Sequence, residues 1–471
     1  MSPNLPIAEI PRHQTEVSEG GEKLSPSAKR TITGAFIGFM VDMYDVYLPI
    51  VALTPALIYF QPKHLAVSTA TTIFYLVFAV ALIGRPIGAF IFGHLADRIG
   101  RQRTTMIAVS GFGIATLLIA LLPGYQQLGM TALYLLIALR LVDGVFLGGE
   151  YTAASPLAME YCPRAKRGLY SAIIQAGYPI AFVVISLFTA AMLILTPAKG
   201  LESPYVQWGW RIPFVFGALI AGLFLLYYRS VPESESWKRS EKGANPIGTL
   251  FSAANRGTFL QVFVVMTGFW LSLLVVVSTI PALLTKEFHY SSTTVTDGLL
   301  LANVVLVGGY LLVGVIGQKI GRRTMLMVLG VLIAVVGSTA YAIMVSTAGP
   351  GNVVQTMALA TVAIVLTVSG WGLLSAYINE RFATGVRASG FGIGYSLAVV
   401  IPAFYSFYLL GLAHFMPYKY TEIPLLVLGG LLILVGGALG PETNHVAIAD
   451  VDVEPLVAAP ALMPYSRPQV I

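Results

Sequence analysis

The sequence predicts an all-α polytopic membrane protein with twelve transmembrane helices in two pseudo-symmetric halves of six. Hydrophobic residues make up 56% of the 471 residues and charged residues only 11%, whereas soluble domains contain about 25% charged residues. Apolar runs of roughly 20 residues, the length that spans a bilayer core, recur along the whole chain. A short charged segment at 93–105 is repeated in weaker form at 317–324. The repeat indicates that the two halves are related.

Each expected helix is an apolar run bounded by proline, glycine or charged residues. Alternating segments of about ten residues, typical of outer-membrane barrels, are absent from the sequence. The longest internal polar segment, 229–256, separates the sixth helix from the seventh. The helices are expected to begin near Thr31, Thr71, Thr104, Thr131, Arg167, Gly209, Gly257, Thr293, Thr324, Val353, Ala388 and Glu422.

Basic residues predict the orientation of these helices. With the N-terminus in the cytoplasm, Arg and Lys gather in the inner loops and the linker, and few remain in the outer loops. This asymmetry also explains the net charge of +6 without a nucleic-acid partner. We expect a multi-pass protein of the cytoplasmic membrane with an N-terminal cytoplasmic tail (1–30), a first half (31–229), a cytoplasmic linker (230–256), a second half (257–440) and a C-terminal cytoplasmic tail (441–471).

Other chain-level features narrow the class further. The first 30 residues are polar and lack the apolar stretch of a signal peptide, so we expect them to be disordered. The single cysteine, Cys162, excludes an internal disulfide and a multi-thiolate metal site. We expect no metal and no cofactor, and a protein that functions as a monomer.

Several motifs carry a resemblance to a known transporter family. They are the charged segment at 93–105, Gly-Arg-Pro-Ile-Gly at 84–88, Arg-Leu-Val-Asp-Gly at 140–144 and Gly-Gly-Glu-Tyr at 148–151. With them the chain resembles the major facilitator superfamily along essentially its whole length, and within it the metabolite:proton symporter group, near the sugar porters. Pro-Glu-Thr at 441–443 resembles the sugar-porter ending. The resemblance implies a transporter that moves a small metabolite with protons.

The sequence departs from the family pattern at two positions in the first half. Asp143 stands where the family usually has an amide, and Met43 where it usually has Trp. Both lie where coupling and substrate contact are expected, so the resemblance does not assign the family's substrates to this protein.

Charged residues at the inner helix ends suggest a latch between the two halves. Salt bridges among these loops would hold the inner faces together while the cavity opens outward; a network of them can bias two states separated by a few kcal/mol. The alternative is that they are ordinary loop charges, which we prefer for Arg103, Arg164 and Lys166. The second charged turn has no Asp before Lys319, which predicts an asymmetric latch. The expected latch residues are Asp97, Arg98, Arg101, Glu160, Arg167, Glu380, Arg387 and Glu442.

Ionisable residues within the expected helices suggest proton coupling. Such residues cost at least about 2.5 kcal/mol near the bilayer centre and mark functional sites. Asp42 and Asp45 share one face of the first helix, and Arg140 and Asp143 share one face of the fourth. We expect Arg140 opposite Asp42 or Asp45, and a second charge pair between Arg85 and Glu150.

Movement that breaks the Arg140 pair would switch the acid between its protonated and ionised forms. Asp45 is the first candidate for the proton carrier, then Asp42, then Asp143. The alternative is that these fixed pairs only brace the first and fourth helices. The second half shows no deeply buried charge in the sequence, so it is expected to supply neutral groups. Candidates for the substrate cavity are Tyr44, Gln175, Tyr178, Trp270, Asn303, Trp371, Tyr377 and Tyr395.

Rival classes lack their motifs in this sequence. The six histidines form no metalloenzyme motif, and no phosphate-binding loop appears, so neither an enzyme nor an ATP-driven pump is expected. Within the transporter class, an organic acid moved by proton symport is the leading hypothesis. The alternatives that stay open are an uncoupled or proton-coupled sugar or polyol transporter and a drug efflux antiporter.

Overall fold

The computed structural model describes residues 24–62, 67–239, 246–446 and 448, and every regular element within these residues is helical. Twelve helical segments among them are long and apolar enough to cross a membrane. The predicted fold class is therefore confirmed. Residues 1–23 and 449–471 of the expected tails, and 240–245 of the expected linker, lie outside the described residues.

The first half contains six spans. The first span begins at Pro26, earlier than the expected Thr31, because Ser25 caps the helix and its Oγ accepts a hydrogen bond from the amide of Ala28 at 3.1 Å. The fifth span consists of two helices that meet at Ala176. The helices of this half are α1 (Pro26–Leu48), α2 (Val67–Ile99), α3 (Arg101–Ala120), the short α4 (Tyr125–Leu128), α5 (Met130–Tyr161), α6 (Arg167–Gln175), α7 (Gly177–Leu195) and α8 (Arg211–Tyr228).

The second half also contains six spans, and three of them are interrupted. A wider π-helical turn at Leu332–Gly337 divides the ninth span, Ser369 and Gly370 divide the tenth, and a turn containing Pro402 divides the eleventh. The helices are α11 (Arg256–Ala282), α12 (Ser292–Ile320), α13 (Arg322–Val331), α14 (Ser338–Thr347), α15 (Val353–Val368), α16 (Trp371–Asn379), α17 (Arg387–Leu397), α18 (Tyr405–Leu412) and α19 (Glu422–Leu439).

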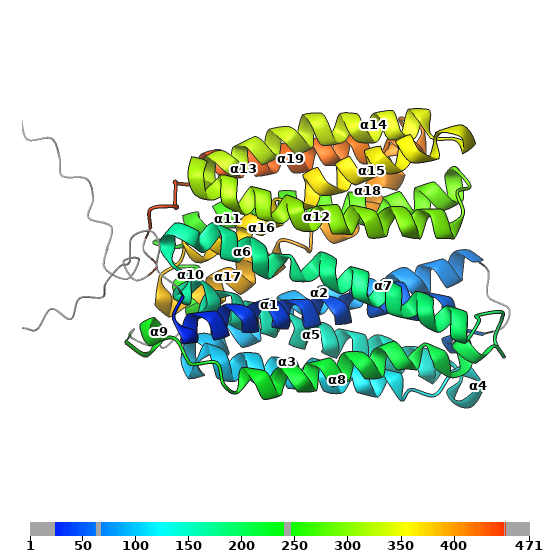
Figure 1. Cartoon of the computed structure of the whole chain (residues 1–471), viewed down its shortest axis with the longest axis horizontal. Helices are drawn as coiled ribbons and strands as arrows, with labels where there is room; N and C mark the ends of the chain where they lie inside the picture. The colour runs from blue at the N-terminus through cyan, green and yellow to red at the C-terminus, as the bar shows by residue number, and fades with distance from the viewer. Residues whose placement is uncertain (1–23, 63–66, 240–245, 447, 449–471) are drawn as a thin grey trace, which may run out of the picture.

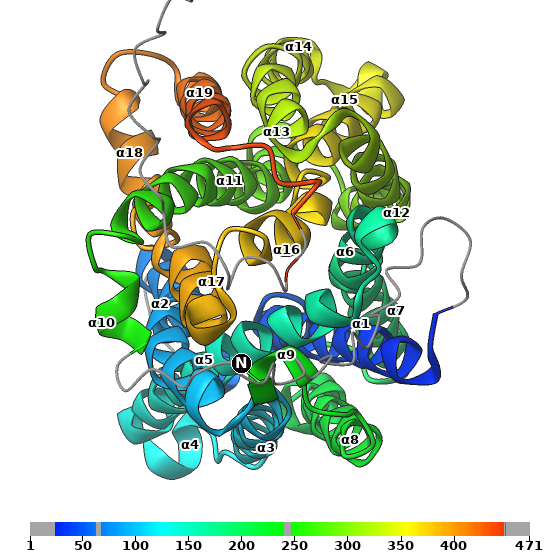
Figure 2. The same cartoon turned by 90° about the vertical axis from the view of Figure 1, so that its left-hand side faces the viewer.

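The two halves lie side by side with their helices along a common axis (Figure 1). α1 begins and α19 ends at the same end of the bundle, where the short helices α9 (Glu235–Arg239) and α10 (Pro246–Leu250) also lie (Figures 1 and 2). These two helices belong to the segment expected as a polar linker. Trp237 of α9 is buried and donates from Nε1 to the carbonyl of Asp97 at 3.0 Å. We call this end of the bundle the charged end, because Asp97, Arg101 and Glu160 lie there.

Glycines allow α2 and α5 to approach until their backbones touch. A Cβ atom at Gly84 would lie 2.6 Å from the carbonyl oxygen of Leu141, and one at Gly88 would overlap the carbonyl of Val145. Gly144 and Gly148 on α5 are equally close to the backbone of α2. Small residues permit this kind of contact in membranes, and here they bring the charged residues of the two helices together.

Candidate functional site

Away from the charged end, six acidic and basic side chains are buried among the described residues of the first half, each at most 4% exposed. They come from only three helices, so the packing of α1, α2 and α5 decides which of them meet. The group consists of Asp42 and Asp45 on α1, Arg85 on α2, and Arg140, Asp143 and Glu150 on α5.

Arg140 lies between two carboxyl groups. Its Nη1 is 2.5 Å from Oδ2 of Asp143, one turn along the same helix, and 3.5 Å from Oδ2 of Asp45 on α1. The hydroxyl of Thr116 on α3 donates to the other oxygen of Asp45. Of its two expected partners, Asp42 and Asp45, Arg140 therefore contacts Asp45. We call Asp45, Arg140 and Asp143 the Arg140 trio.

Arg85 pairs with Asp42 and not, as expected, with Glu150. Its Nη2 lies 2.6 Å from Oδ2 of Asp42, whereas neither carboxyl oxygen of Glu150 has a hydrogen-bond partner. The expectation rested on similar depth in the membrane, but the direction of the side chains decides the pairing. Glu150 points toward α1 at Gly38, where a Cβ atom would lie 2.5 Å from its Oε1. We call Asp42, Arg85 and Glu150 the Arg85 trio.

Aromatic side chains from both halves meet beside the Arg85 trio. The rings of Trp270 and Trp371 lie 4.7 Å apart, and Tyr395 lies 5.5 Å from each of them. Tyr151 of the first half lies 4.7 Å from Tyr395. Gln175 donates to the hydroxyl of Tyr151. Four of the expected cavity residues, Gln175, Trp270, Trp371 and Tyr395, thus gather at one place, in a conformation where all of them are buried.

Of the other four expected cavity residues, Tyr44 and Tyr377 lie elsewhere. The hydroxyl of Tyr44 donates to the carbonyl of Pro213 at 3.1 Å, which places the ring between α1 and α8. Tyr377 accepts a hydrogen bond from Gln261 at 2.8 Å and lies beside Gly440, near the charged end. Tyr178 packs on Tyr47, and the side-chain amide of Asn303 donates within its own helix. Residue type and depth alone did not indicate which face of each helix is turned inward.

A row of small polar side chains joins the halves between the aromatic group and the charged end. Ser155 of α5 lies 2.9 Å from Ser375 of α16 and accepts from Asn379 at 3.1 Å. The hydroxyl of Ser171 donates to the carbonyl of Gly372 at 2.7 Å. The sequence does not indicate these residues, because single serines in apolar helices carry no signal by themselves. We call Ser155, Ser171, Ser375 and Asn379 the polar seam.

Ion pairs close the charged end on the α5 side. Glu160 at the end of α5 binds Arg101 of the same half at 2.5 Å and also binds Arg387 of the other half. The guanidinium of Arg101 reaches across to the carbonyl of Thr384 at 3.0 Å. Asp97 accepts hydrogen bonds from the backbone amides of Ala388 and Ser389, at 3.2 and 3.0 Å, at the start of α17.

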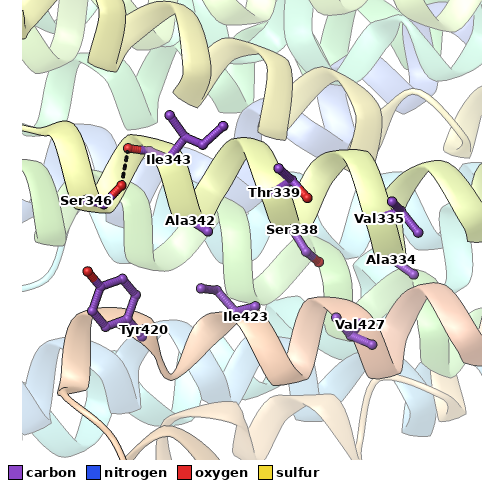
Figure 3. Close-up of a pocket in the computed structure, with 10 residues that line it drawn as sticks. All are labelled: Ala334, Val335, Ser338, Thr339, Ala342, Ile343, Ser346, Tyr420, Ile423 and Val427. Atoms are coloured by element: carbon purple, nitrogen blue, oxygen red, sulfur yellow. Dashed lines mark hydrogen bonds between the residues drawn. The ribbon is translucent and has the colours of Figure 1, made fainter.

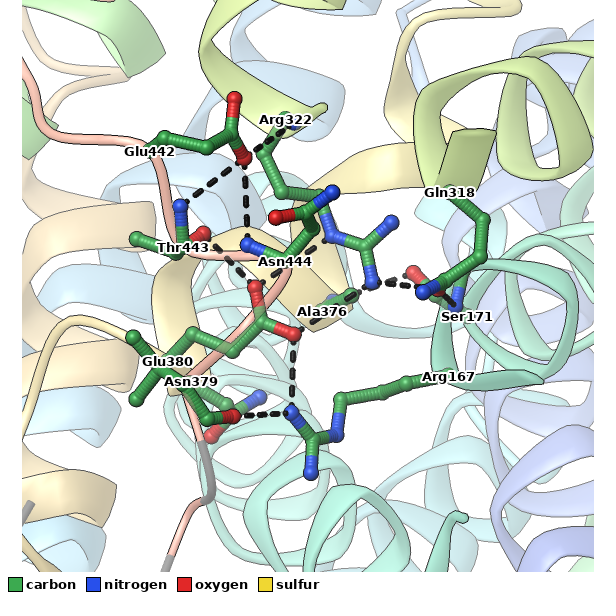
Figure 4. Close-up of polar contacts among 12 residues, drawn as sticks. Arg167, Ser171, Gln318, Arg322, Ala376, Asn379, Glu380, Glu442, Thr443 and Asn444 are labelled. Atoms are coloured by element: carbon green, nitrogen blue, oxygen red, sulfur yellow. Dashed lines mark hydrogen bonds and ion pairs between the residues drawn. The ribbon is translucent and has the colours of Figure 1, made fainter. Parts of the chain in front are cut away.

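The α16 side has the same arrangement (Figure 4). Glu380 binds Arg167 of the first half at 2.9 Å and Arg322 of its own half at 3.3 Å. Gln318 accepts from the amide of Gly168 at 2.9 Å, as Asp97 does at α17. The expected asymmetry is therefore wrong at the level of geometry: an amide takes the place of the missing carboxylate, because an amide oxygen can also accept a backbone N–H.

Two acids cap the helices that follow the charged turns. Glu442 accepts from the amides of Arg322 and Arg323 at 2.7 and 3.1 Å, and Glu233 accepts from the amide of Gln102 at 3.0 Å. Carboxylates are favourable at helix N-termini. Glu233 and Arg322 were not among the expected latch residues, and Arg98, which was, is exposed.

One buried acid lies far from these groups. Glu422 at the start of α19 is 1% exposed, although the sequence suggested no deeply buried charge in the second half. In the sequence, Glu422 stands at the expected start of the twelfth helix. A cavity of about 570 Å³ lies nearby, between α14 and α19, and is lined mainly by apolar and hydroxyl side chains (Figure 3). Within the described part of the chain, no group of three His, Cys, Asp or Glu residues could hold a metal ion.

Comparisons with known proteins agree with this fold. The sequence model of the Major Facilitator Superfamily matches residues 35–405. The Inner membrane metabolite transport protein YhjE of Escherichia coli (strain K12) is 30% identical over 393 residues, which cover 80% of this chain and 86% of that protein. The Shikimate transporter of the same strain is 28% identical over 443 residues, covering 90% and 97%.

A solved structure shows the same fold. The proton:xylose symporter XylE bound to 6-bromo-6-deoxy-D-glucose aligns with a TM-score of 0.71 at 20% identity, over 91% of this chain and 99% of that chain. These relatives are transporters and not enzymes. With a family match over most of its length and the twelve-span architecture, this chain belongs to the major facilitator superfamily of membrane transporters.

Proposed function

We propose that this protein is a secondary active transporter that carries a small organic acid across the cytoplasmic membrane together with protons. The charged end faces the cytoplasm in this proposal, because the basic residues of the loops gather there. The two halves then alternate in access around the buried charges.

The observation that carries proton coupling is the Arg140 trio. One guanidinium lies between two carboxyl groups, all at most 2% exposed. Two ionised carboxylates beside one guanidinium would leave a net negative charge in a medium of low polarity, which is unfavourable. Contact of Arg140 with both carboxylates limits this cost, and one bound proton removes the excess charge when the contact to Asp45 is lost. The longer of the two contacts, from Arg140 to Asp45 at 3.5 Å, joins different helices and is the one that helix movement can break.

Coupling follows from this contact. When α1 moves relative to α5, Asp45 loses the guanidinium that favours its ionised form and takes up a proton. When the contact forms again, the proton is released on the other side of the membrane. Asp45 is the carrier in this scheme, and Asp143 stays with Arg140 because both lie on α5.

The ion pairs of the charged end act as the latch. Glu160 and Glu380 each bind one arginine from either half. Opening toward the cytoplasm must break the pairs that join the halves, and the side chains of both acids and of their arginines are buried, each at most 5% exposed. The latch therefore favours the conformation closed toward the cytoplasm.

An organic acid fits the buried positive charges. Arg85 and Arg140 are the guanidinium groups of the core, and guanidinium binds carboxylate in a two-pronged geometry. The 28% identical relative is named for shikimate, which is a hydroxylated carboxylic acid. A sugar or polyol is the second candidate, because the polar seam offers groups that bind hydroxyls.

The test of coupling uses the Asp45→Asn variant, with Asp297→Asn as the matched control because Asp297 is exposed on α12. In proteoliposomes with an imposed proton gradient, Asp45→Asn is expected to lose uphill accumulation and keep substrate exchange. The control is expected to behave as wild type. If Asp45→Asn still accumulates substrate against its gradient, Asp45 is not the carrier.

The substrate is found by a thermal-shift screen of the purified protein against mono-, di- and tricarboxylates, sugars and betaines, followed by counterflow of each hit at two pH values. Carboxylates are expected to raise the melting temperature. Stabilisation by neutral sugars alone would refute the organic-acid assignment and favour the second candidate.

A further inference from the structure

Glu150 is a fully buried acid that the coupling scheme above does not use. It is 0% exposed, and neither of its oxygens has a hydrogen-bond partner. Its carboxyl group lies in a slot between helices, against Gly38 of α1. The ring of Phe224 of α8 borders the same slot, since a Cβ atom at Gly38 would lie 2.8 Å from it. A carboxylate in such a place would cost several kcal/mol.

The charged and titratable groups that face Glu150 are few. Asp42 on α1 and Arg85 on α2 lie within electrostatic range, as do the phenols of Tyr151 on its own helix and Tyr228 on α8. Arg85 is the only cation among them and is already bound to Asp42 at 2.6 Å. The Arg85 trio therefore has one positive charge for two acids, and it is neutral only when it holds one proton.

We propose that the Arg85 trio binds one proton, which sits on Glu150 in this closed conformation and passes to Asp42 when Arg85 changes partner. The proposal rests on the proton-coupled function and adds a second proton-binding group to it. Glu150 is the group that holds the proton because Asp42 has the guanidinium, while Glu150 has no donor to stabilise an ionised form.

The exchange conserves both charge and protons. The O–H bond of Glu150 breaks and an O–H bond forms on the Asp42 carboxylate, directly or through water. At the same time the guanidinium of Arg85 leaves Asp42 and binds the new Glu150 carboxylate. The trio remains neutral before and after the step, so no net charge is created in the membrane interior.

Gly38 allows the protonated carboxyl group of Glu150 to stay in the slot. Its missing side chain leaves the space that the carboxyl group occupies. In a Gly38→Ala variant the added methyl group would overlap the carboxyl group and turn it out of the slot toward Arg85. That variant is expected to favour the exchanged arrangement without altering any titratable group.

Infrared spectroscopy of the purified full-length protein tests the proposal without any substrate. At neutral pH the wild type is expected to show a protonated-carboxyl band that disappears in Glu150→Gln. The same band is expected to disappear in Asp42→Asn, because a neutral residue at position 42 frees Arg85 to ionise Glu150. Asp297→Asn is the control and should keep the band.

The Asp42→Asn result separates a proton-exchange group from an acid that is merely buried. If Glu150→Gln leaves every protonated-carboxyl band in place, Glu150 is ionised and the proposal is wrong. If the band vanishes in Glu150→Gln but persists in Asp42→Asn, Glu150 does not exchange with Asp42 and the proposal is also wrong. Gly38→Ala should weaken or shift the band, and an unchanged band would contradict the role of the slot.

Failure of the proposed function shows in a different measurement. If the wild type does not accumulate any substrate under a proton gradient, proton coupling is wrong whatever the infrared bands are. If the wild type is coupled and Glu150→Gln has the same coupling and the same dependence of uptake on pH, the inference about Glu150 is wrong and the proposed function stands.

Discussion

Adjacent arginines at the charged end differ sharply in burial. Arg322 is 0% exposed and binds Glu380 at 3.3 Å, whereas its neighbour Arg323 is exposed. The sequence presents both as loop charges, because neither periodicity nor composition separates them. Burial gives them different energetic roles: an exposed pair is worth about 0–1 kcal/mol, but breaking a buried pair costs about 3–5 kcal/mol.

Truncation of these two arginines tests the difference. Arg322→Ala is expected to destabilise the protein by about 3 kcal/mol, the lower end of that range because Glu380 keeps Arg167. Arg323→Ala is expected to change stability by less than about 0.5 kcal/mol. Thermal unfolding in detergent measures both. Equal melting temperatures for the two variants would show that Arg322 has no structural role.

The residue-level expectations for the buried acids were partly right. Asp45 meets Arg140 as expected, because residues at similar depth on facing helices have few other partners in a membrane. The pairing of Arg85 with Asp42 was missed. Depth can be estimated from the sequence, but the direction in which Glu150 points depends on the space left by Gly38 on another helix.

At the scale of elements, the contact between α2 and α5 positions both trios. Arg85 lies on one of these helices and Arg140, Asp143 and Glu150 on the other. Their backbones touch at Gly88, where a side chain would collide with the carbonyl of Val145. Backbone cannot move aside as a flexible side chain can, so the separation of the helices is fixed by the glycine.

A single methyl group at this contact should separate the helices. Gly88→Ala is expected to lower stability by about 1–3 kcal/mol, as overpacking does elsewhere, and to impair transport through the displaced charges. Gly222→Ala on α8 is the matched control, since a Cβ there meets nothing within 4 Å, and it should be neutral or slightly stabilising. The measurement is the melting temperature of each variant relative to wild type. A Gly88→Ala protein as stable as the control would contradict the close contact.

Helix existence was predicted well and helix interruptions were not. All twelve expected spans are present, because an apolar run of this length has few other stable structures in a membrane. The divisions of the fifth, ninth, tenth and eleventh spans were missed. Glycine and serine occur in many uninterrupted helices of this chain, so they mark no particular break.

The charged turns show how one local pattern serves both halves. Gly100 and Gly321 have positive φ angles of 108° and 100°, which other residues rarely adopt. Each glycine directly precedes a helix, α3 or α13, that an acid caps. The capping acids Glu233 and Glu442 come from distant segments, so the turn was predictable and its partner was not.

At the scale of the whole molecule, the proposed latch would control access to the charged end, and the single cysteine can report on it. Cys162 is buried beside the latch residues Glu160 and Arg167. Burial raises the pKa of its thiol to about 12, so the reactive thiolate is scarce at neutral pH. When the end opens, the thiol reaches water and its pKa falls toward the usual value of about 8.5.

Weakening the latch should therefore speed labelling of Cys162. Glu380→Gln, which removes a charge bound to both halves, is expected to raise the rate of maleimide labelling about tenfold, since a buried pair biases the equilibrium by more than about 1.4 kcal/mol. The rate should rise further between roughly pH 7 and 9 in the variant, as the exposed thiol ionises near 8.5, and stay low in wild type. Glu287→Gln, at an exposed position, is the control. Equal labelling of all three proteins would refute the latch.

The sequence by itself determined the class of this protein, its twelve spans and the residues that carry charge into the membrane. It did so because the backbone has few stable structures in an apolar environment, and because burying an ionisable group there is costly and therefore marks a functional position. Only the tertiary structure decided which charges pair, which arginines are buried, and that Gln318 completes the second turn. These outcomes depend on side-chain direction and on contacts between segments that are distant in the chain, which local patterns do not encode.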